Sequence, residues 1–291
     1  MFRGKLLSVL LAGLCALPAM AKCGGPETLF EWGASSKSDS DSSGDDSGKE
    51  KPLESDRPGF GDCPSAVGCD RCELEIGYQY SYDREANTSE IQHTYPQSLL
   101  RVGALANWFE LRVSWSQEQD TDRVFGVSSH TDVGSQDMSV GFKIALTDQD
   151  HWLPKTGLVV DATVPTGSEA FTTHKFLPEV EYIYEWELTK QLTFDAVTEL
   201  SDFADDVTDR EFLAISEAAG VQRKLNEQLS AYVQWHITTP HEADTFQTQQ
   251  VFEGGLILLL SNNLQWDGEY GVGLNSATPD YFVGTGLSMR R

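Results

Sequence analysis

The chain has 291 residues, of which 40% are hydrophobic, and a formal net charge of −24. This length suffices for one large β domain or two smaller ones, and the apolar content is ordinary for a folded protein. The acidic balance excludes nucleic-acid binding, which needs basic patches that contact phosphates.

Residues 1–21 have the pattern of a secretory signal peptide. Two basic residues precede the apolar segment Leu6–Leu17, and Ala19–Ala21 supply the small residues that a signal peptidase recognises. We therefore expect export, with cleavage at the end of this range. Lipidation at Cys23 is the alternative, and Lys22 disfavours it because such processing needs a small residue at that position.

Residues 22–71 are predicted to form a disordered, Ser/Asp-rich tether that carries a cysteine cluster. The part from 33 to 56 is rich in Ser, Asp, Gly and Lys and has almost no apolar residue. Such a segment cannot bury enough surface to offset the entropy lost on ordering. Calcium capture by its aspartates is disfavoured, because their spacing fits no loop with converging ligands.

Four cysteines follow the predicted signal peptide: Cys23, Cys63, Cys69 and Cys72. In an oxidising envelope compartment they are candidates for disulfide bonds, above all the cluster of Cys63, Cys69 and Cys72, and the three connectivities stay open. A zinc site is disfavoured, because no histidine lies near the cluster and zinc usually takes four ligands. We therefore expect no bound metal.

From Cys72 onward the hydrophobic periodicity is two residues, as in β-strands, and not the 3.6 of helices. In the first such segment Leu74 and Ile76 share one face, and Glu73 and Glu75 share the other. The segments that follow this pattern, three of them less cleanly, are 72–82, 97–105, 109–115, 138–146, 158–164, 179–186, 192–196, 210–222, 229–236, 249–260, 264–274 and 281–289. The sequence therefore predicts an all-β, antiparallel fold of about twelve strands.

The connections between these segments alternate in length. Short ones lie near 106–107, 188–191, 225–227 and 261–263, with a middling one at 148–154; longer polar ones lie near 83–96, 117–135, 165–175, 202–209 and 238–247. Short turns on one rim and long loops on the other are typical of up-and-down outer-membrane barrels. No apolar run of about 18 residues follows the leader, so a membrane-spanning form has to be a β-barrel. We therefore predict a transmembrane barrel over 72–291.

The polar faces of the strands are predicted to line a lumen. A barrel of about twelve strands is too wide to be packed fully by side chains, which favours a polar interior over a soluble sandwich or a lipocalin-like barrel. The predicted lumen-lining residues are Glu75, Arg101, Arg112, Lys143, Asp161, Glu181, Glu185, Asp195, Glu199, Asp267 and Glu269. An aromatic girdle at the membrane interface is expected beside the short turns, from Trp108, Trp152, Trp186 and Trp266.

No catalytic residue is predicted. The Gly-x-Ser-x-Gly and His-Glu-x-x-His motifs are absent. His236 with Ser230 or Gln234 could belong to a membrane-embedded lipase site. We interpret His236 instead as a polar residue of the lumen, because the spacing places no serine and carboxylate beside it. Paired carboxylates such as Glu179 and Glu181 recur on several strands, which favours a pore field with mild cation preference over a glycosidase site. No cofactor is expected.

Several stretches together resemble a known family: Ser55–Phe60, Glu73–Tyr78, Leu99–Gly103 with Phe109–Val113, Val164–Ser168 and Gly271–Gly284. They are similar to the outer-membrane, transporter-like family named after the meta-pathway of phenol degradation, over about residues 55–290. The resemblance implies an outer-membrane barrel and passage of small, aromatic or hydrophobic molecules. The chain departs from the family pattern in its cysteine insert, in its tether and in ending on Arg291 without a terminal aromatic residue.

The sequence thus predicts an outer-membrane barrel, with both termini in the periplasm, that lets small solutes pass passively. Its expected partners are the lipid bilayer, the solutes and the outer-membrane assembly machinery. The alternative is a non-conducting structural or ligand-binding barrel whose lumen is closed by a folded-in loop or by the N-terminal segment. A barrel hydrolase has the least support.

Overall fold

The computed structural model describes residues 24–30, 51–205 and 207–291, so the predicted signal peptide and much of the predicted tether lie outside it. All regular secondary structure of the described chain is β-strand. Its strands are β1 (Cys72–Arg84), β2 (Thr88–Gly103), β3 (Phe109–Trp115), β4 (Gln117–Val124), β5 (Ser128–Ser135), β6 (Met138–Thr147), β7 (Lys155–Val164), β8 (Leu177–Thr189), β9 (Leu192–Ala204), β10 (Glu211–Lys224), β11 (Leu229–His241), β12 (Gln249–Ser261), β13 (Leu264–Gly273) and β14 (Tyr281–Arg290). None of the described residues belongs to a helix that is long and apolar enough to cross a membrane.

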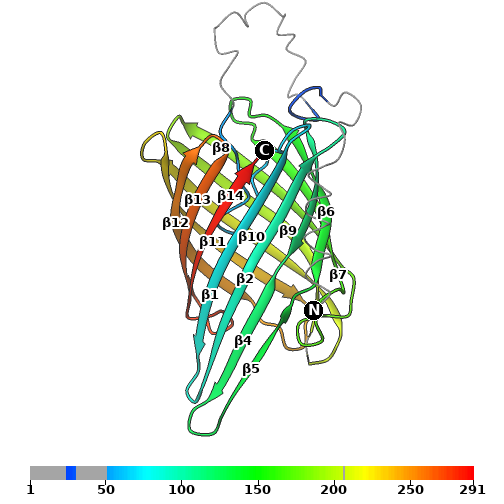
Figure 1. Cartoon of the computed structure of the whole chain (residues 1–291), viewed down its shortest axis with the longest axis vertical. Coiled ribbons are helices and arrows are strands. Elements are labelled where there is room, and N and C mark those ends of the chain that lie inside the picture. The colour runs from blue at the N-terminus through cyan, green and yellow to red at the C-terminus, as the bar shows by residue number, and fades with distance from the viewer. Residues whose placement is uncertain (1–23, 31–50, 206) are drawn as a thin grey trace, which may run out of the picture.

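All strands of the 14-stranded sheet except β4 and β5 form a closed antiparallel barrel (Figure 1). Sequence neighbours pair from β6 to β14, β3 joins β6 to β2, and β1 closes the ring by pairing with both β2 and β14. At this seam Leu74 pairs with Met289, and Tyr82 pairs with Tyr281. The predicted all-β antiparallel barrel of about twelve strands is confirmed.

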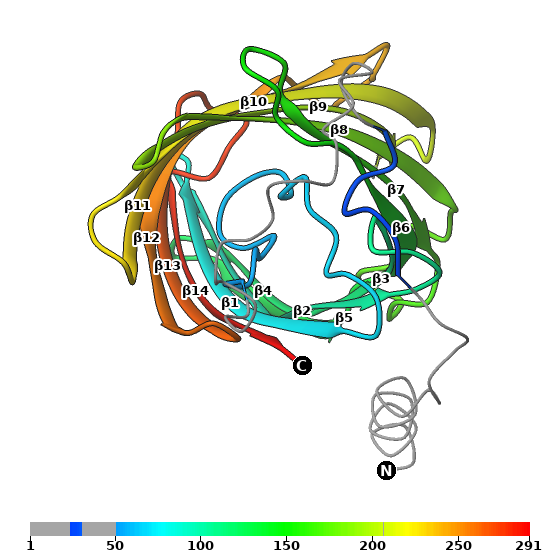
Figure 2. The ribbon, with the colours of Figure 1, turned by 90° about the horizontal axis from the view of Figure 1, so that it is seen from above.

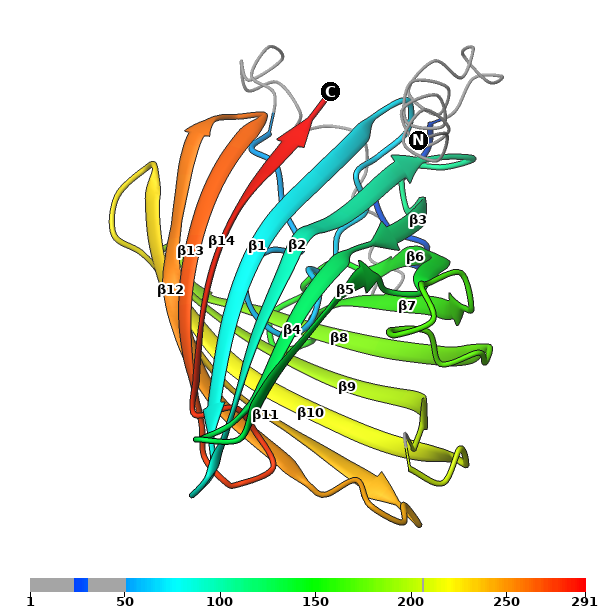
Figure 3. The ribbon, with the colours of Figure 1, turned by 60° about the horizontal axis from the view of Figure 1, so that its bottom comes forward.

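The hairpin of β4 and β5 extends the sheet beyond the barrel (Figure 3). Within the 16 residues of β2, Ser98–Gly103 pair with β3, and Thr88–Thr94 pair with β4. The segments 83–96 and 117–135 are therefore mainly strand, and the prediction of long loops there is wrong. Polar residues on both faces of these segments resemble a loop in sequence, although the pairing with β2 makes them strands.

The remaining connections differ in length between the two rims of the barrel (Figure 1). On one rim, called the short-turn rim, lie the turns 104–108, 148–154, 190–191, 225–228 and 262–263, together with the start of β1 and the end of β14. On the opposite, long-loop rim lie the longer connections that follow β7, β9, β11 and β13. The alternation expected from the sequence is thus present in these connections except at 148–154, which is as long as the connections after β11 and β13.

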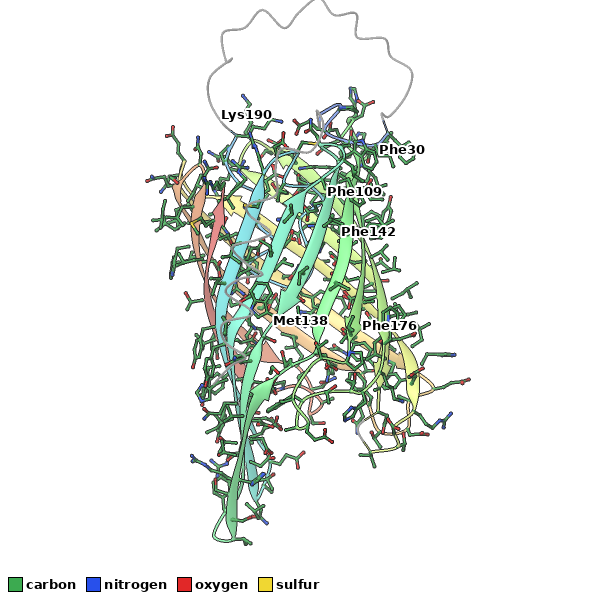
Figure 4. The ribbon with its side chains drawn as sticks, turned by 45° about the vertical axis from the view of Figure 1, so that its right-hand side comes forward. Phe30, Phe109, Met138, Phe142, Phe176 and Lys190 are labelled. Atoms are coloured by element: carbon green, nitrogen blue, oxygen red, sulfur yellow. The ribbon has the colours of Figure 1, made fainter. Side chains whose placement is uncertain are left out.

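Alternate residues of each barrel strand face the lumen and the outside. Arg101 and Lys143 face inward and are 0% exposed, whereas Leu111 faces outward and is 49% exposed. Phe109 and Phe142 lie on the outer surface of β3 and β6, with ring centroids 5.7 Å apart (Figure 4). Charged side chains inside and apolar ones outside invert the arrangement of a soluble protein and match a barrel whose outer face contacts lipid.

Candidate functional site in the barrel lumen

Residues 51–71, called the plug from here on, enter the barrel and run through its lumen (Figure 2). Backbone N–H groups of the plug donate to carboxylates of the wall, from Asp62 to Glu181 at 2.8 Å and from Val67 to Glu110 at 2.8 Å. The structure therefore differs from the tether expected over 22–71, because its last part is ordered by contacts with distant strands.

The plug residue Asp56 binds three cations of the wall: Arg101 of β2, Arg112 of β3 and Lys143 of β6, called the basic cluster. Asp56 Oδ2 is 2.6 Å from Arg112 Nη1 and 3.3 Å from Arg101 Nε, and Asp56 Oδ1 is 2.6 Å from Lys143 Nζ. Arg101 of β2 and Arg112 of β3 are cross-strand partners. Lys143 of β6 lies opposite Glu110, which is two residues before Arg112 on the same face of β3, so the three cations converge. Burial alone would raise the pKa of Asp56, but the three cations hold that pKa well below its usual range.

Further carboxylates complete the neutralisation of the basic cluster. Glu110 Oε1 is 2.8 Å from Arg101 Nε, and Glu75 Oε1 is 3.4 Å from Arg101 Nη1. From the plug, Asp62 Oδ2 is 2.6 Å from Arg112 Nη2. Buried charges need such partners, because an uncompensated buried ion carries its full desolvation cost. The plug and the wall therefore form one ion-pair network.

Arg57 attaches the plug to a second part of the wall. Its Nη2 is 3.3 Å from Asp267 Oδ1 of β13, and its Nη1 donates to Gln97 Oε1 of β2 at 3.1 Å. The guanidinium lies against Gly77 of β1 and the cross-strand partner of Gly77, Gly286 of β14. A Cβ added to either glycine would lie 2.3 Å from a guanidinium nitrogen. The close approach of the plug therefore requires glycine on both strands.

Phe60 is the apolar contact of the plug. It packs against the buried side chains of Val159, Ile183 and Val197, which face the lumen from β7, β8 and β9. On its other side the ring of Phe60 stacks on His236, with centroids 4.5 Å apart. The histidine considered for a lipase site is therefore a contact of the plug.

Cys63 is a half-buried residue of the plug with a free thiol, so the disulfide expected to include it is a wrong prediction. Its N–H donates to Asp56 Oδ1 at 3.0 Å, and its carbonyl oxygen accepts from Lys143 Nζ at 2.9 Å. Burial raises the pKa of the thiol well above its usual range. The thiol is therefore protonated, and for that reason slow to react, while the plug is docked.

The other cysteines lie at the short-turn rim or beyond the described residues. Cys69 is disulfide-bonded. Cys72 begins β1, where its backbone exchanges two hydrogen bonds with Arg291 at 2.9 and 2.8 Å. Cys23, the fourth candidate for pairing, lies outside the described residues.

The residues predicted to line the lumen all lie on inward positions of the barrel strands, where they are buried or half-buried. The structure separates them into two groups. Around the basic cluster lie Glu75, Arg101, Arg112, Lys143 and Asp161; along β8, β9 and β13 lie Glu181, Glu185, Asp195, Glu199, Asp267 and Glu269. The second group is entirely acidic, whereas the first contains three cations.

Three carboxylates of the acidic part come close together. Glu179, Glu181 and Glu199 each place one oxygen within 4.8 Å of the others. Hard cations such as Ca²⁺ prefer oxygen ligands of this kind. Carboxylates also cluster on polar walls where no ion is bound, so we assign no metal to this group.

Sequence reasoning missed the residues of the plug that touch the wall. Asp56, Arg57 and Phe60 belong to the Ser55–Phe60 stretch that carries the family resemblance, and this was the only sign of their importance. Glu110, by contrast, alternates with residues assigned to the apolar face, so the period-two pattern of β3 could have identified it.

The four tryptophans predicted to form a girdle lie at the short-turn rim. Trp108 and Trp152 are in turns, Trp186 is near the end of β8, and Trp266 is near the start of β13. The Nε1 of Trp186 donates to the carbonyl oxygen of Trp152 at 3.0 Å. Toward the other rim, neighbouring tyrosine rings that the sequence analysis did not assign are those of Tyr80, Tyr82, Tyr270 and Tyr281.

Comparisons with known proteins agree with this architecture. The model of the family described as "Putative MetA-pathway of phenol degradation" matches residues 55–290. No curated protein matches the chain.

Three solved barrels are similar in structure and distant in sequence. An outer membrane channel from Pseudomonas putida F1 has a TM-score of 0.63 at 13% identity, over 77% of this chain and 96% of that chain. The beta domain of the Bordetella autotransporter BrkA has a TM-score of 0.47 at 10% identity, over 75% of this chain and 98% of that chain. The NanC porin has a TM-score of 0.43 at 12% identity, over 75% of this chain and 98% of that chain.

Proposed function

Because the chain belongs to this phenol-degradation family and has the fold of an outer-membrane channel, we propose that small solutes pass through it passively. The observation that carries the proposal is the charged inner wall, where Lys143 of β6 and Glu181 of β8 face the lumen and are covered by the docked plug. Charged rings along a barrel interior select which solutes enter. The same wall favours small polar solutes over the aromatic or hydrophobic ones implied by the family resemblance.

The plug favours a second candidate, a non-conducting structural or ligand-binding barrel. Asp56, Arg57 and Phe60 attach it to three different parts of the wall. A segment that is fixed in this way narrows the lumen. In the channel proposal, conduction depends on the position of the plug; in the second candidate, the plug stays docked and the barrel does not conduct.

We place the barrel in the outer membrane with both termini on the periplasmic side, since bacterial outer-membrane barrels have their short turns there. The four tryptophans at that rim would then form the aromatic girdle at the periplasmic interface of the outer membrane. The lipid bilayer is the surrounding partner, and the assembly machinery of the outer membrane is the expected protein partner. The proposal includes neither catalysis nor a cofactor.

Planar-bilayer recordings of the purified full-length protein test the channel. We expect discrete conductance steps and a reversal potential in a KCl gradient that indicates cation preference. Absence of steps in the wild-type protein and also in Asp56→Asn, which loosens the plug, would leave only the non-conducting barrel.

Selectivity tests the acidic part of the wall. The double variant Glu181→Gln/Glu185→Gln removes two carboxylates of β8 and should lower the cation preference, whereas Glu227→Gln, in an exposed turn, should not. Unchanged selectivity in the double variant would contradict the role given to these two residues.

A further inference from the structure

A cavity of about 250 Å³ lies between the plug and the strands β1, β2 and β13. Among its lining residues are Arg57 of the plug, Glu75 and Gln79 of β1, Gln97 of β2 and Glu269 of β13. Pockets that hold drug-sized ligands have volumes of roughly 300–1,000 Å³. This cavity therefore suits a ligand with few heavy atoms.

Glu75 has one carboxylate oxygen without a partner at this cavity. The residue is only 1% exposed. Its Oε1 accepts from the Asp56 N–H at 3.0 Å and lies 3.4 Å from Arg101 Nη1. Its Oε2 has no hydrogen-bond partner within the part of the chain that the structure describes. Since an unpaired buried carboxylate oxygen is costly, a donor brought to this oxygen would stabilise the site.

Glu269 supplies a second carboxylate to the same cavity. Its Oε2 accepts from the Gly59 N–H at 3.2 Å and from Tyr232 Oη at 3.4 Å. Arg57, the cation of the cavity, forms its ion pair with Asp267 at 3.3 Å instead. Glu269 forms no ion pair with a described residue, although Arg57 lies close enough to act on its charge, so a cationic ligand would give it a direct partner.

Two amides complete an acceptor-rich lining. Arg57 Nη1 donates to Gln97 Oε1 at 3.1 Å, and Gln97 Nε2 donates to Gln79 Oε1 at 2.8 Å. These two hydrogen bonds stay within the lining, and Glu75 Oε2 keeps accepting capacity. Arg57 Nε has no hydrogen-bond partner among the described residues, but it lies against Gly286 of β14, outside the lining of the cavity. A matching ligand has to bring both positive charge and N–H groups.

We propose that this cavity binds small primary alkylammonium ions, and, on the basis of the proposed channel function, that protonated amines are among the solutes that enter the lumen. A primary ammonium carries one charge and three N–H donors. Charge-assisted hydrogen bonds to carboxylates are stronger than neutral ones. The two carboxylates provide such acceptors on β1 and β13.

Isothermal titration calorimetry of the full-length protein in detergent micelles tests the proposal, with propylammonium chloride as the probe. We expect saturable binding. Tetramethylammonium chloride carries the charge without N–H donors and should bind at least tenfold more weakly, and 1-propanol, which lacks the charge, should give no saturable binding. Saturable binding of propanol, equal affinity for tetramethylammonium, or no binding of propylammonium overturns the proposal.

Two variants and one control locate the site. Glu75→Gln and Glu269→Gln should each weaken propylammonium binding at least tenfold, and Glu227→Gln, in an exposed turn, should leave it unchanged. Glu269→Gln keeps an oxygen acceptor for the Gly59 N–H and therefore tests the site even if Glu75→Gln disturbs the plug. Unchanged affinity in Glu269→Gln overturns the assignment.

The calorimetric result does not depend on conduction. Binding of propylammonium by a protein that shows no channel steps would contradict the proposed channel and support the cavity. Channel steps without such binding would contradict the cavity and support the channel.

Discussion

Replacing Asp56 with asparagine removes the plug charge that contacts all three cations of the basic cluster. Breaking a buried ion pair by removing one partner costs about 3–5 kcal/mol. Glu110 and Glu75 remain beside Arg101 at 2.8 and 3.4 Å, so we expect the lower end of this range, about 3 kcal/mol. Since each 1.4 kcal/mol is a factor of ten, the undocked plug should become about a hundredfold more populated.

The thiol of Cys63 reports on docking, because it is half-buried beside Asp56 and its pKa is raised while the plug is docked. The rate of its alkylation in the full-length protein, measured by mass spectrometry of the peptide that contains it, follows the population of the undocked state. We expect alkylation about a hundredfold faster in Asp56→Asn than in wild type.

Asp70→Asn, at an exposed position of the plug, is the matched control and should leave the rate unchanged. Heat-modifiable electrophoretic mobility shows whether the barrel itself is intact. Alkylation of Asp56→Asn at the wild-type rate, in a folded barrel, would refute the idea that the basic cluster holds the plug.

The ion pairs of Asp56 with the basic cluster also predict how docking of the plug responds to pH. The cations hold the pKa of Asp56 well below its usual range. A depressed carboxyl pKa contributes stability that is fully present above the unfolded value, about 3.9, and is lost as the pH falls through the folded value. Asp56 should therefore cause no change in docking between about pH 5 and 8, as measured by Cys63 alkylation corrected for the thiolate fraction of a model thiol.

Three further changes test other contacts. Phe60→Ala removes a half-buried ring, so we expect about 2 kcal/mol in place of the ~3–5 of a fully buried phenylalanine, and roughly thirtyfold faster alkylation of Cys63; an unchanged rate would show that the ring contributes nothing to docking. Gly77→Val puts a side chain where the Arg57 guanidinium lies and should also speed the alkylation of Cys63. In an Arg57→Ala background the same substitution should have no further effect on the rate. A further increase there would contradict the idea that Gly77 is needed to make room for Arg57. Asp205 accepts hydrogen bonds from Thr245 Oγ1 at 2.6 Å and the Thr208 N–H at 2.9 Å, which hold its pKa well below the usual range. The protection of amides in the loops after β9 and β11, measured as the exchange rate relative to that of an unstructured peptide at the same pH, should therefore stay constant above about pH 4 and fall only at lower pH; a loss of protection nearer pH 7 would count against this role.

The barrel could be predicted from the sequence because each of its strands has one face toward lipid and one toward the lumen. Leu74 and Ile76 alternate with Glu73 and Glu75 for this reason, and the register with β14 confirms the assignment of the first strand. The β4–β5 hairpin lacks this constraint, because its residues are largely exposed on both faces. Its strands are specified by pairing with β2, which a local pattern does not contain.

The plug escaped prediction for a different reason. The composition of residues 33–56 predicts a stretch with no core of its own, and residues 33–50 lie outside the described part of the chain. Order in the plug comes instead from residues far along the chain: Asp56 pairs with Arg112 and Lys143, which are 56 and 87 residues away. The wall positions could be assigned from their alternation, but the partners that they bind could not.

The attachments through Asp56, Arg57 and Phe60 lie within five residues of one another and contact different parts of the wall. If the plug undocks as one unit, the costs of Asp56→Asn and Phe60→Ala add, and the double variant should alkylate Cys63 faster by the product of the two single effects. If each attachment is released locally, the exposure of Cys63 follows the contact beside it. That contact is Asp56, whose Oδ1 accepts the Cys63 N–H at 3.0 Å.

A double-mutant cycle separates the two cases. Adding Phe60→Ala to Asp56→Asn should multiply the rate again if docking is all-or-none, and should leave it unchanged if the Asp56 end is released by itself. We expect the product, because Phe60 packs on β7, β8 and β9, whereas Asp56 binds β2, β3 and β6. A plug as short as this cannot leave one of these surfaces without straining its contact with the other.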